Sequence, residues 1–159
     1  MNFIIRDATP NDMYQVLDLI KELASYEREP EAVIISAEDL QRDGFGAHPL
    51  FHCFVAEIEG NIGGIALLYE RYSTWKGKTV HLEDLIVRES MRGNGIGNAL
   101  FKEVIKYGHS LGVKRVEWNV LDWNEPAINF YESKGAEVLR DWDVVHLNEE
   151  EIENFISNL

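Results

Sequence analysis

Cysteine and long apolar runs are both scarce in this sequence. Its single cysteine, Cys53, excludes an internal disulfide, and within the apolar stretch FHCFVAE it is interpreted as a small buried side chain. No apolar run approaches the roughly 20 residues that a membrane-spanning helix needs, so no membrane partner is expected. The first residues, MNFIIRDATP, lack the basic and long apolar segments of a targeting signal, and a cytoplasmic location is therefore expected.

Positive charge is also scarce, because 15 Lys and Arg residues stand against 28 Asp and Glu residues, for a formal net charge of −13. A field of this sign repels phosphate polymers, so nucleic acid is not an expected partner. The same field concentrates small cations near the surface, but an acidic surface also simply keeps a protein soluble. The net charge alone therefore does not show whether the acidic residues attract a cationic ligand or only keep the protein soluble.

The 159 residues are enough for one hydrophobic core, and they show no internal repeat, linker or low-complexity segment. We therefore predict a single domain over 1–159. Apolar residues at helical spacing predict five helices, and antiparallel hairpins in the first half with strand–helix–strand order in the second predict a mixed α+β sheet. Apolar, β-rich runs predict strands over 3–6, 51–58, 62–72, 79–87, 116–120 and 142–147.

The helix predicted after Ser36 has clear boundaries in the sequence. Ser36 is followed three residues later by Asp39, which is the pattern of a capping box. Gly44 and Gly46 are predicted to end this helix, because glycine is favoured just past helix C-termini. The tripeptide EGN that follows the next strand then predicts a β-hairpin turn.

Three glycines alternate in the stretch MRGNGIGNALF, between a predicted strand and a predicted helix. Peptide N–H groups without side chains can turn toward one anion there, aided by the positive end of the helix dipole. The alternative is a turn that only packs the strand against the helix. A P-loop is excluded because no Gly-Lys-Ser/Thr is present, and the Gly93-x-Gly95-x-Gly97 spacing fits the dinucleotide fingerprint poorly.

The run from Arg92 to Gly97 does match the Arg/Gln-x-x-Gly-x-Gly/Ala signature of the GNAT superfamily of N-acetyltransferases. LDWNEPAINFYESKGA resembles the later motif of that family. VHLEDLIVRESMRGNGIG, IKELASYE and DGFGAHPLFHCFVAE are similar to the diamine branch, which comprises the spermidine/spermine and thialysine N-acetyltransferases. Together these segments cover nearly the whole chain.

This resemblance implies a GNAT (acyl-CoA N-acyltransferase) fold, an α+β fold whose central mixed, mostly antiparallel sheet is flanked by helices on both faces. It also implies acetyl-CoA as cosubstrate and a homodimer. The five histidines show no metal-ligand spacing, so no metal is expected.

The resemblance assigns cofactor binding to a strand edge, the glycine loop and the start of a later helix. Ala127 stands where polyamine-acetylating relatives often carry Ser, so one contact is expected to be lost. The strand residues can equally be plain core, because side chains and main chain have different roles. The cofactor-binding residues implied are Leu85, Ile86, Val87, Arg92, Gly93, Asn94, Gly95, Ile96, Gly97, Asn98, Asn124 and Ala127.

Acetyl transfer to an amine requires a proton acceptor, because only roughly one alkyl ammonium in a thousand is neutral at pH 7. By its place in the family motif, Glu83 is the expected base and ammonium ligand, acting directly or through water. Successive strand side chains alternate, so either Glu83 or Asp84 is expected to face the substrate. The alternative is a solvated charge pair at a strand bulge.

Tyr131 matches the family tyrosine that protonates the departing thiolate, although a tyrosine on an apolar helix face can also be simple core. Tyr26 and Glu27 match the positions at which the diamine branch contacts its acceptor. With Glu83 they would form a slot that is negative at two points and suits a chain with two amines. Trp75 could form a wall of that slot.

Three functions follow from the sequence. The leading one is acetyl transfer from acetyl-CoA to a primary amine of a small polyamine or thialysine-like acceptor, by direct attack in a ternary complex. The second is a GNAT enzyme with another acceptor, such as an antibiotic, another metabolite or a protein N-terminus. The third is a non-catalytic acyl-CoA-binding module.

Overall fold

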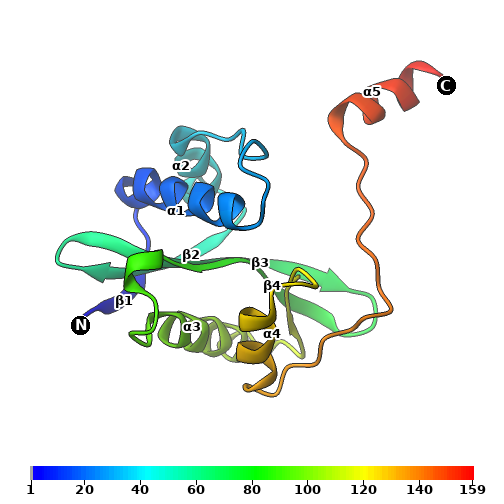
Figure 1. The fold of residues 1–159 in the computed structure, drawn as a ribbon. Coiled ribbons are helices and arrows are strands. Elements are labelled where there is room, and N and C mark those ends of the chain that lie inside the picture. The colour runs from blue at the N-terminus through cyan, green and yellow to red at the C-terminus, as the bar shows by residue number, and fades with distance from the viewer. Residues whose placement is uncertain (1) are drawn as a thin grey trace. The chain divides into compact units, whose positions relative to one another are not determined.

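The computed structural model describes residues 2–159 (Figure 1). Within these residues the strands form a five-stranded sheet, with helices before, between and after them. The elements in chain order are β1 (Ile4–Asp7), the 3-10 turn η1 (Pro10–Asp12), α1 (Met13–Tyr26), α2 (Ala37–Phe45), β2 (His52–Ile58), β3 (Asn61–Ser73), β4 (Gly77–Val87), the 3-10 turn η2 (Glu89–Met91), α3 (Ile96–Ser110), β5 (Val116–Glu117), α4 (Glu125–Glu132) and α5 (Glu149–Ser157).

The strands lie in the order β1-β2-β3-β4-β5, and the first three pairings are antiparallel. The β2–β3 hairpin turns at Glu59 and Gly60, which both have positive φ, as the EGN signal predicts. Only β4 and β5 are parallel, and they pair solely through Val80 with Val116 and His81 with Glu117. The expected mixed, mostly antiparallel sheet is therefore confirmed, and β4 lies between β3 and β5.

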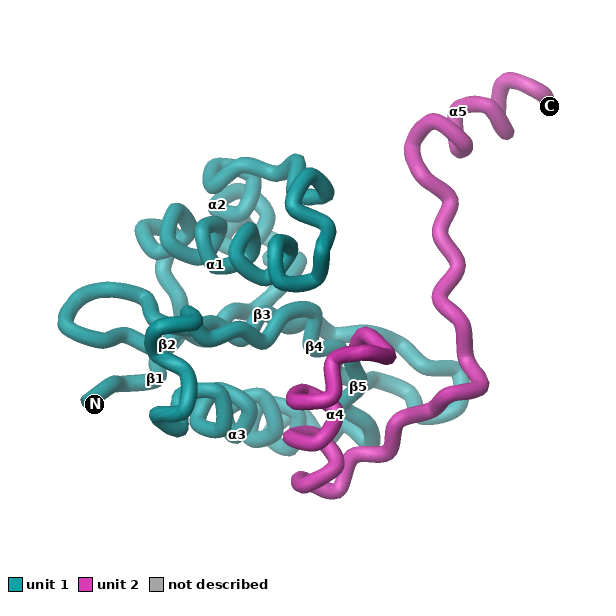
Figure 2. Tube along the Cα trace, in the orientation of Figure 1, with its two compact units in different colours: residues 1–119 teal, residues 120–159 magenta. Residues whose placement is uncertain are grey.

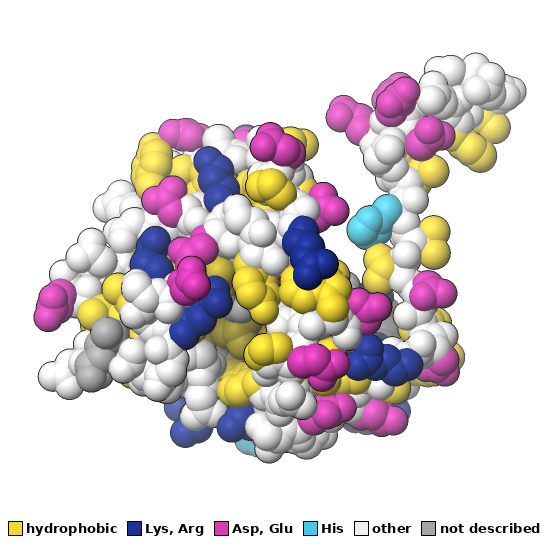
Figure 3. All heavy atoms as spheres, viewed as in Figure 1, with side chains coloured by type: hydrophobic (Ala, Val, Ile, Leu, Met, Phe, Trp, Pro, Cys, Tyr) yellow, Lys and Arg dark blue, Asp and Glu magenta, His cyan; other side chains and the backbone are white. Residues whose placement is uncertain are grey.

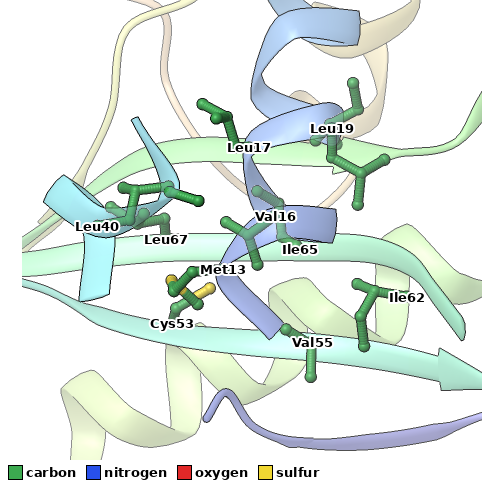
Figure 4. Packing of buried hydrophobic residues seen from close by; sticks show 12 residues of the cluster. Met13, Val16, Leu17, Leu19, Leu40, Cys53, Val55, Ile62, Ile65 and Leu67 are labelled. Atoms are coloured by element: carbon green, nitrogen blue, oxygen red, sulfur yellow. The ribbon is translucent and has the colours of Figure 1, made fainter. Parts of the chain in front are cut away.

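Helices cover both faces of this sheet, with α1 and α2 on one side and α3 on the other (Figure 1). Under α1 lies a core of buried apolar side chains, which the close view in Figure 4 shows. On the other face α3 approaches β3 at Gly64, where an added Cβ would lie 3.1 Å from Leu100 and 3.3 Å from Ile96. The buried residues of the α1 side are Met13, Val16, Leu17, Leu19, Ala37, Leu40, Cys53, Val55, Ile62, Ile65, Leu67 and Ile86.

Local hydrogen bonds explain where α2 begins and ends. The Ser36 hydroxyl accepts from the Asp39 amide at 3.1 Å, and the Asp39 carboxylate accepts from the Ser36 amide at 2.9 Å, which is the predicted capping box. The prediction that Gly44 ends this helix is wrong, because the helix continues to Phe45 and ends at Gly46. An added Cβ at Gly44 would lie 2.4 Å from the Phe51 ring, so glycine is needed there for close packing.

The chain divides into two compact units, Met1–Asn119 (unit 1) and Val120–Leu159 (unit 2) (Figure 2). The sheet, α1, α2 and α3 belong to unit 1, and α4 and α5 belong to unit 2. The single domain over 1–159 stays a prediction. No helix within residues 2–159 combines the length and the apolar character that crossing a membrane requires.

The strand predicted over 142–147 is absent from the structure, and this prediction is wrong. Its alternating apolar residues are exposed, with Trp142 at 68% and Val145 at 89% of full exposure. A strand needs a neighbour to pair with, and within the described chain this segment has no ladder partner. The strand predicted over 116–120 is likewise shorter, because only Val116 and Glu117 pair with β4.

Candidate active site

The strand β4 is interrupted by a β-bulge at Glu83. Leu67 of β3 faces Asp84 and Leu68 faces Leu82, so Glu83 is the extra residue and has no facing partner. Glu83 is exposed while Asp84 is half-buried. The strict alternation expected for this pair therefore does not hold, because a bulge turns neighbouring side chains away from the regular pleat.

Three carboxylates interact electrostatically around this bulge. Burial, followed by the charges of Glu83 and Glu27, raises the pKa of Asp84 to about 6. Glu27 is the C-cap residue of α1, and burial raises its pKa as well. Burial is the first cause of both shifts, because it disfavours the charged form of a carboxyl group. Unit 1 thus brings the predicted acceptor residue Glu27 and the predicted base Glu83 into one negative site together with Asp84.

Two further side chains surround Glu83. Tyr69 of β3 faces His81, and burial, followed by the negative charge of Glu83, raises the pKa of Tyr69. Nε2 of His81 lies 3.6 Å from a carboxylate oxygen of Glu83. Sequence reasoning missed both residues. The only available signal was the i, i+2 spacing of His81 and Glu83 along one strand.

The glycine loop joins β4 to α3. Gly93 and Gly95 have φ values of 78° and 82°, a left-handed conformation in which an added Cβ would meet nothing within 4 Å. Glycine is therefore required there by conformation and leaves open space above the loop. Gly97 is not required in this way, because an added Cβ would lie 3.6 Å from Val87, which is an ordinary van der Waals contact. Asn94 braces the loop by donating to the Met91 carbonyl at 3.1 Å.

The amides after this loop are free to bind a ligand. The hydrogen-bond ladder of α3 begins where the Ala99 amide donates to the Gly95 carbonyl at 3.0 Å, so the amides of residues 96–98 precede it. Arg92 is anchored beside the loop, with Nε donating to the Val87 carbonyl at 3.0 Å. Its guanidinium also lies 5.4 Å from the centre of the Tyr26 ring. The loop therefore combines unpaired N–H groups, a helix N-terminus and one cation, which suits a phosphate group.

One edge of β4 is open beside the loop. In the described chain β3 pairs with β4 as far as Val87, whereas β5 stops at His81. Beyond His81 no strand of the described chain pairs with β4 on the β5 side, although the Val87 carbonyl already accepts from Nε of Arg92 at 3.0 Å. An extended amide-containing ligand can add to such an unpaired edge as a strand would. The Ile86 side chain is buried in the core, and a cofactor contact of its main chain stays a prediction.

The remaining predicted residues lie at the rim or in unit 2. Trp75 lies in the β3–β4 turn and is 78% exposed. In unit 2, Asn124 caps α4 by accepting from the Ala127 amide at 3.4 Å. Tyr131 is buried near the end of α4, with its ring edge-on to Phe130 at 5.3 Å. The structure thus divides the predicted residues between a carboxylate and glycine-loop group in unit 1 and an α4 group in unit 2.

A bulged strand leads into a glycine loop and a helix beside three carboxylates, so unit 1 combines a place suited to an anion with a place suited to a cation. The chain belongs to the Acetyltransferase (GNAT) family, whose model matches residues 13–136. This confirms the predicted GNAT fold and an N-acetyltransferase activity, and members of this family use acetyl-CoA as cosubstrate.

Curated proteins and solved structures agree with this family. The chain is 40% identical over 151 residues to thialysine N-epsilon-acetyltransferase of Bos taurus, covering 90% of this chain and 89% of that protein. It is 37% identical to spermidine/spermine N(1)-acetyltransferase-like protein 1 of Homo sapiens, covering 94% of this chain and 23% of that protein. An integron cassette protein from V. cholerae matches the fold with a TM-score of 0.79 at 22% identity, covering 98% of each chain.

Proposed function

We propose that this N-acetyltransferase acetylates a primary amine of a small, doubly cationic acceptor, either a polyamine or a thialysine- or lysine-like amino acid. The observation that carries the proposal is that Glu27 and Glu83 lie near enough to Asp84, at the β4 bulge, for their charges to add to burial in raising its pKa. Carboxylates gathered in this way attract cations, and a bound ammonium group relieves their repulsion. Three such groups suit an acceptor with two positive charges better than one with a single charge.

The relatives support the same acceptor class. Several are named thialysine N-epsilon-acetyltransferase, one is named for spermidine and spermine, and one from Arabidopsis thaliana is an L-ornithine N5-acetyltransferase. Thialysine, ornithine and the polyamines each carry a terminal primary amine and at least one further amine. The alternatives of an antibiotic or protein N-terminus as acceptor, and of a non-catalytic module, have no comparable support.

In the proposed reaction the ammonium group binds beside the bulge and transfers its proton to Glu83. The neutral amine then attacks the thioester carbonyl directly in a ternary complex. Exposure of Glu83 allows the proton to pass directly or through a water molecule. Tyr26 and Glu27 would hold the distal part of the acceptor, with Trp75 at the rim. This assignment of roles rests on the family motif and on the placement of these side chains in unit 1.

We assign acetyl-CoA to the open edge of β4 and to the glycine loop. The left-handed Gly93 and Gly95 leave the space that a pyrophosphate needs, and Arg92 supplies a positive charge at its edge. The open edge at Leu85, Ile86 and Val87 suits the amides of the pantetheine arm. The loop residues proposed to contact the pyrophosphate are Arg92, Gly93, Asn94, Gly95, Ile96, Gly97 and Asn98.

Unit 2 would supply the acid and further cofactor contacts. Tyr131 is the proposed proton donor to the thiolate that leaves, because a phenol has a pKa near that of a thiol. Asn124 and Ala127 at the start of α4 are proposed cofactor contacts, although Ala127 offers no hydroxyl to the cofactor. No metal has a part in this mechanism.

We also propose a homodimer in a cytoplasmic setting. Residues 139–159 of unit 2 carry a series of exposed apolar side chains, some of which are visible on the surface in Figure 3. A second copy of the chain would remove this surface from water. Deletion of residues 139–159 should convert a dimer to a monomer in sedimentation equilibrium, and a full-length chain that sediments as a monomer would contradict the dimer. The exposed residues are Leu139, Trp142, Val144, Val145, Leu147, Ile152, Phe155, Ile156 and Leu159.

The experiment that tests the proposed function is a thiol-release assay with acetyl-CoA. The panel should contain a polyamine, a diamine, thialysine, lysine, an aminoglycoside and a peptide with a free N-terminus. We expect turnover with the first four and little with the last two. Turnover with only the aminoglycoside or only the peptide would contradict the proposed acceptor and identify that compound class instead. Tight CoA binding without any turnover would favour a non-catalytic binding module.

A further inference from the structure

His81 is a buried histidine at the centre of a polar cluster on unit 1. On one side it faces Tyr69 of β3. The centroids of the two rings are 5.1 Å apart, and the ring planes make an angle of 32°. On the other side it faces Glu117 of β5. The histidine retains only 6% of its exposure, so its ring lies in a fixed place between two strands.

The two nitrogens of His81 have different surroundings. Nε2 lies 3.6 Å from the carboxylate of Glu83, whereas Nδ1 is buried and has no hydrogen-bond partner among residues 2–159. Buried polar atoms in native proteins are nearly always paired, so an exception calls for an explanation. In most functional histidines the partner of one nitrogen fixes which nitrogen carries the proton. Here no described group fixes the tautomer, and Nε2 can present either an N–H group or a lone pair to Glu83.

The charged groups around the ring shift the pKa of His81 in opposite directions. Burial is the largest influence and lowers the pKa of His81, while Glu83 and Glu117 raise it and Arg71 lowers it. Arg71 and Arg115 both pair with Glu117, at 2.8 and 2.6 Å, and so reduce its effect on the ring. Tyr69 faces His81 from β3, and burial raises the pKa of its hydroxyl, so it brings no charge to the ring. Glu83 is therefore the carboxylate to which His81 can respond most directly, and the ring is neutral at neutral pH.

We propose that His81 is a positioning residue for Glu83 and that the two side chains together hold the proton that leaves the acceptor ammonium. The ammonium N–H bond breaks as its proton passes across the Glu83 carboxylate, and a new N–H bond forms at Nε2. The products are a neutral amine and an imidazolium paired with a carboxylate. Because Glu83 regains its negative charge, the site keeps its attraction for the second positive charge of the acceptor. This inference rests on the proposed function of Glu83.

The test begins with His81→Gln, assayed with acetyl-CoA and the best amine of the panel. We expect kcat to fall roughly tenfold while KM for acetyl-CoA is unchanged. The acid limb of kcat/KM should move to lower pH, because a lone carboxylate is protonated at lower pH than an imidazole. His52→Gln is the matched control, since His52 also pairs with a carboxylate, Asp7 at 2.9 Å, on the first two strands. An unchanged kcat and pH profile in His81→Gln would overturn the inference.

A second measurement does not depend on activity or on the folding of a buried variant. Nitrogen NMR of the imidazole rings follows the titration of His81 in the wild-type chain and in Glu83→Gln, where the substituted residue is exposed. Removal of the Glu83 charge should lower the pKa of His81 further, and an identical titration would contradict the pairing. If the wild-type chain acetylates no amine, the proposed function fails, whereas this titration still decides whether the two residues are coupled.

Discussion

Glu83 and Asp84 are neighbours in β4, yet only Asp84 faces a residue of β3, because Glu83 is the extra residue of the bulge. This relationship gives the two carboxylates different environments. Asp84 is half-buried with a raised pKa, and Glu83 is exposed between Tyr69 and His81. The exposed Glu83 is therefore the side chain that we propose as the base, and Asp84 adds negative charge next to it in the strand.

Replacement of Glu83 by Gln should abolish most of the acetylation. We expect kcat to fall roughly 10- to 1000-fold, because a general base of this kind contributes a large rate factor. Steady-state thiol release at several pH values measures this effect. Glu70→Gln is the control, because Glu70 forms an exposed pair with Lys78 at 2.6 Å and such pairs contribute little. Equal losses in both variants would contradict a specific role for Glu83.

Asp84 should make the stability of the fold depend on pH. Its pKa is about 6 in the folded chain and 3.8 ordinarily, so the folded chain holds the proton more tightly. Asp84 therefore contributes stability below about pH 4 that is lost as the pH rises through about 6. Asp84→Asn should raise the free energy of unfolding at about pH 8 by roughly 1–3 kcal/mol. Urea unfolding across this range measures it, and a variant with the wild-type pH slope would contradict the burial of a charge here.

The same substitution should weaken amine binding. Loss of one of three coupled carboxylates reduces the attraction for the second charge of the acceptor. We expect KM for a diamine to rise while KM for acetyl-CoA is unchanged. A variant that is more stable and binds the amine equally well would show that Asp84 serves neither the substrate nor the fold.

Gly95→Ala should weaken the binding of acetyl-CoA and leave the binding of the amine unchanged. A non-glycine residue at φ of 82° costs about 1–2 kcal/mol, and the loop would shift to relieve this strain. We expect KM for acetyl-CoA to rise several-fold. Gly60→Ala is a matched control, because Gly60 also has positive φ (81°) and open space but lies in the β2–β3 turn. Equal stability losses with a changed KM only in Gly95→Ala would support the loop assignment, and an unchanged KM would contradict it.

Tyr131→Phe should lower kcat without a comparable change in either KM. Removal of the hydroxyl removes the proposed acid while the ring still packs against Phe130. Tyr14→Phe is the control, since the exposed Tyr14 hydroxyl donates to the Glu38 carboxylate at 2.8 Å and neither residue belongs to the proposed site. The loss in Tyr131→Phe should shrink with a more acidic thiol leaving group. A loss of stability without a loss of kcat would assign Tyr131 to packing alone.

Local chemistry predicted much of the fold. The Ser36 capping box and the EGN turn depend on residues close in sequence, and both occur as expected. Gly44 was misinterpreted because the residue that requires it, Phe51, comes from the next strand. The prediction of a strand over 142–147 also failed because it depends on residues far away in the sequence. Alternating apolar residues indicate a half-buried surface, but they do not supply a partner strand.

The site was predictable only where the sequence motif is local. The glycine loop and Glu83 follow from contiguous residues. The raised pKa of Asp84 depends first on burial, then on Glu83 and on Glu27, which is far away in the sequence. The bulge depends on how β3 pairs with β4. His81 escaped notice because its relevance comes from burial between Tyr69 and Glu117, which no spacing along the chain reveals.

The most direct test of the account compares two acceptors of equal length, a diamine and the corresponding monoamine, by kcat/KM at saturating acetyl-CoA. The second amine should make kcat/KM for the diamine at least roughly tenfold higher than for the monoamine. This ratio corresponds to about 1.4 kcal/mol of added charge attraction, and added salt should reduce it. Equal kcat/KM for both amines, or turnover of neither, would contradict the proposal that the coupled carboxylates select a doubly cationic acceptor.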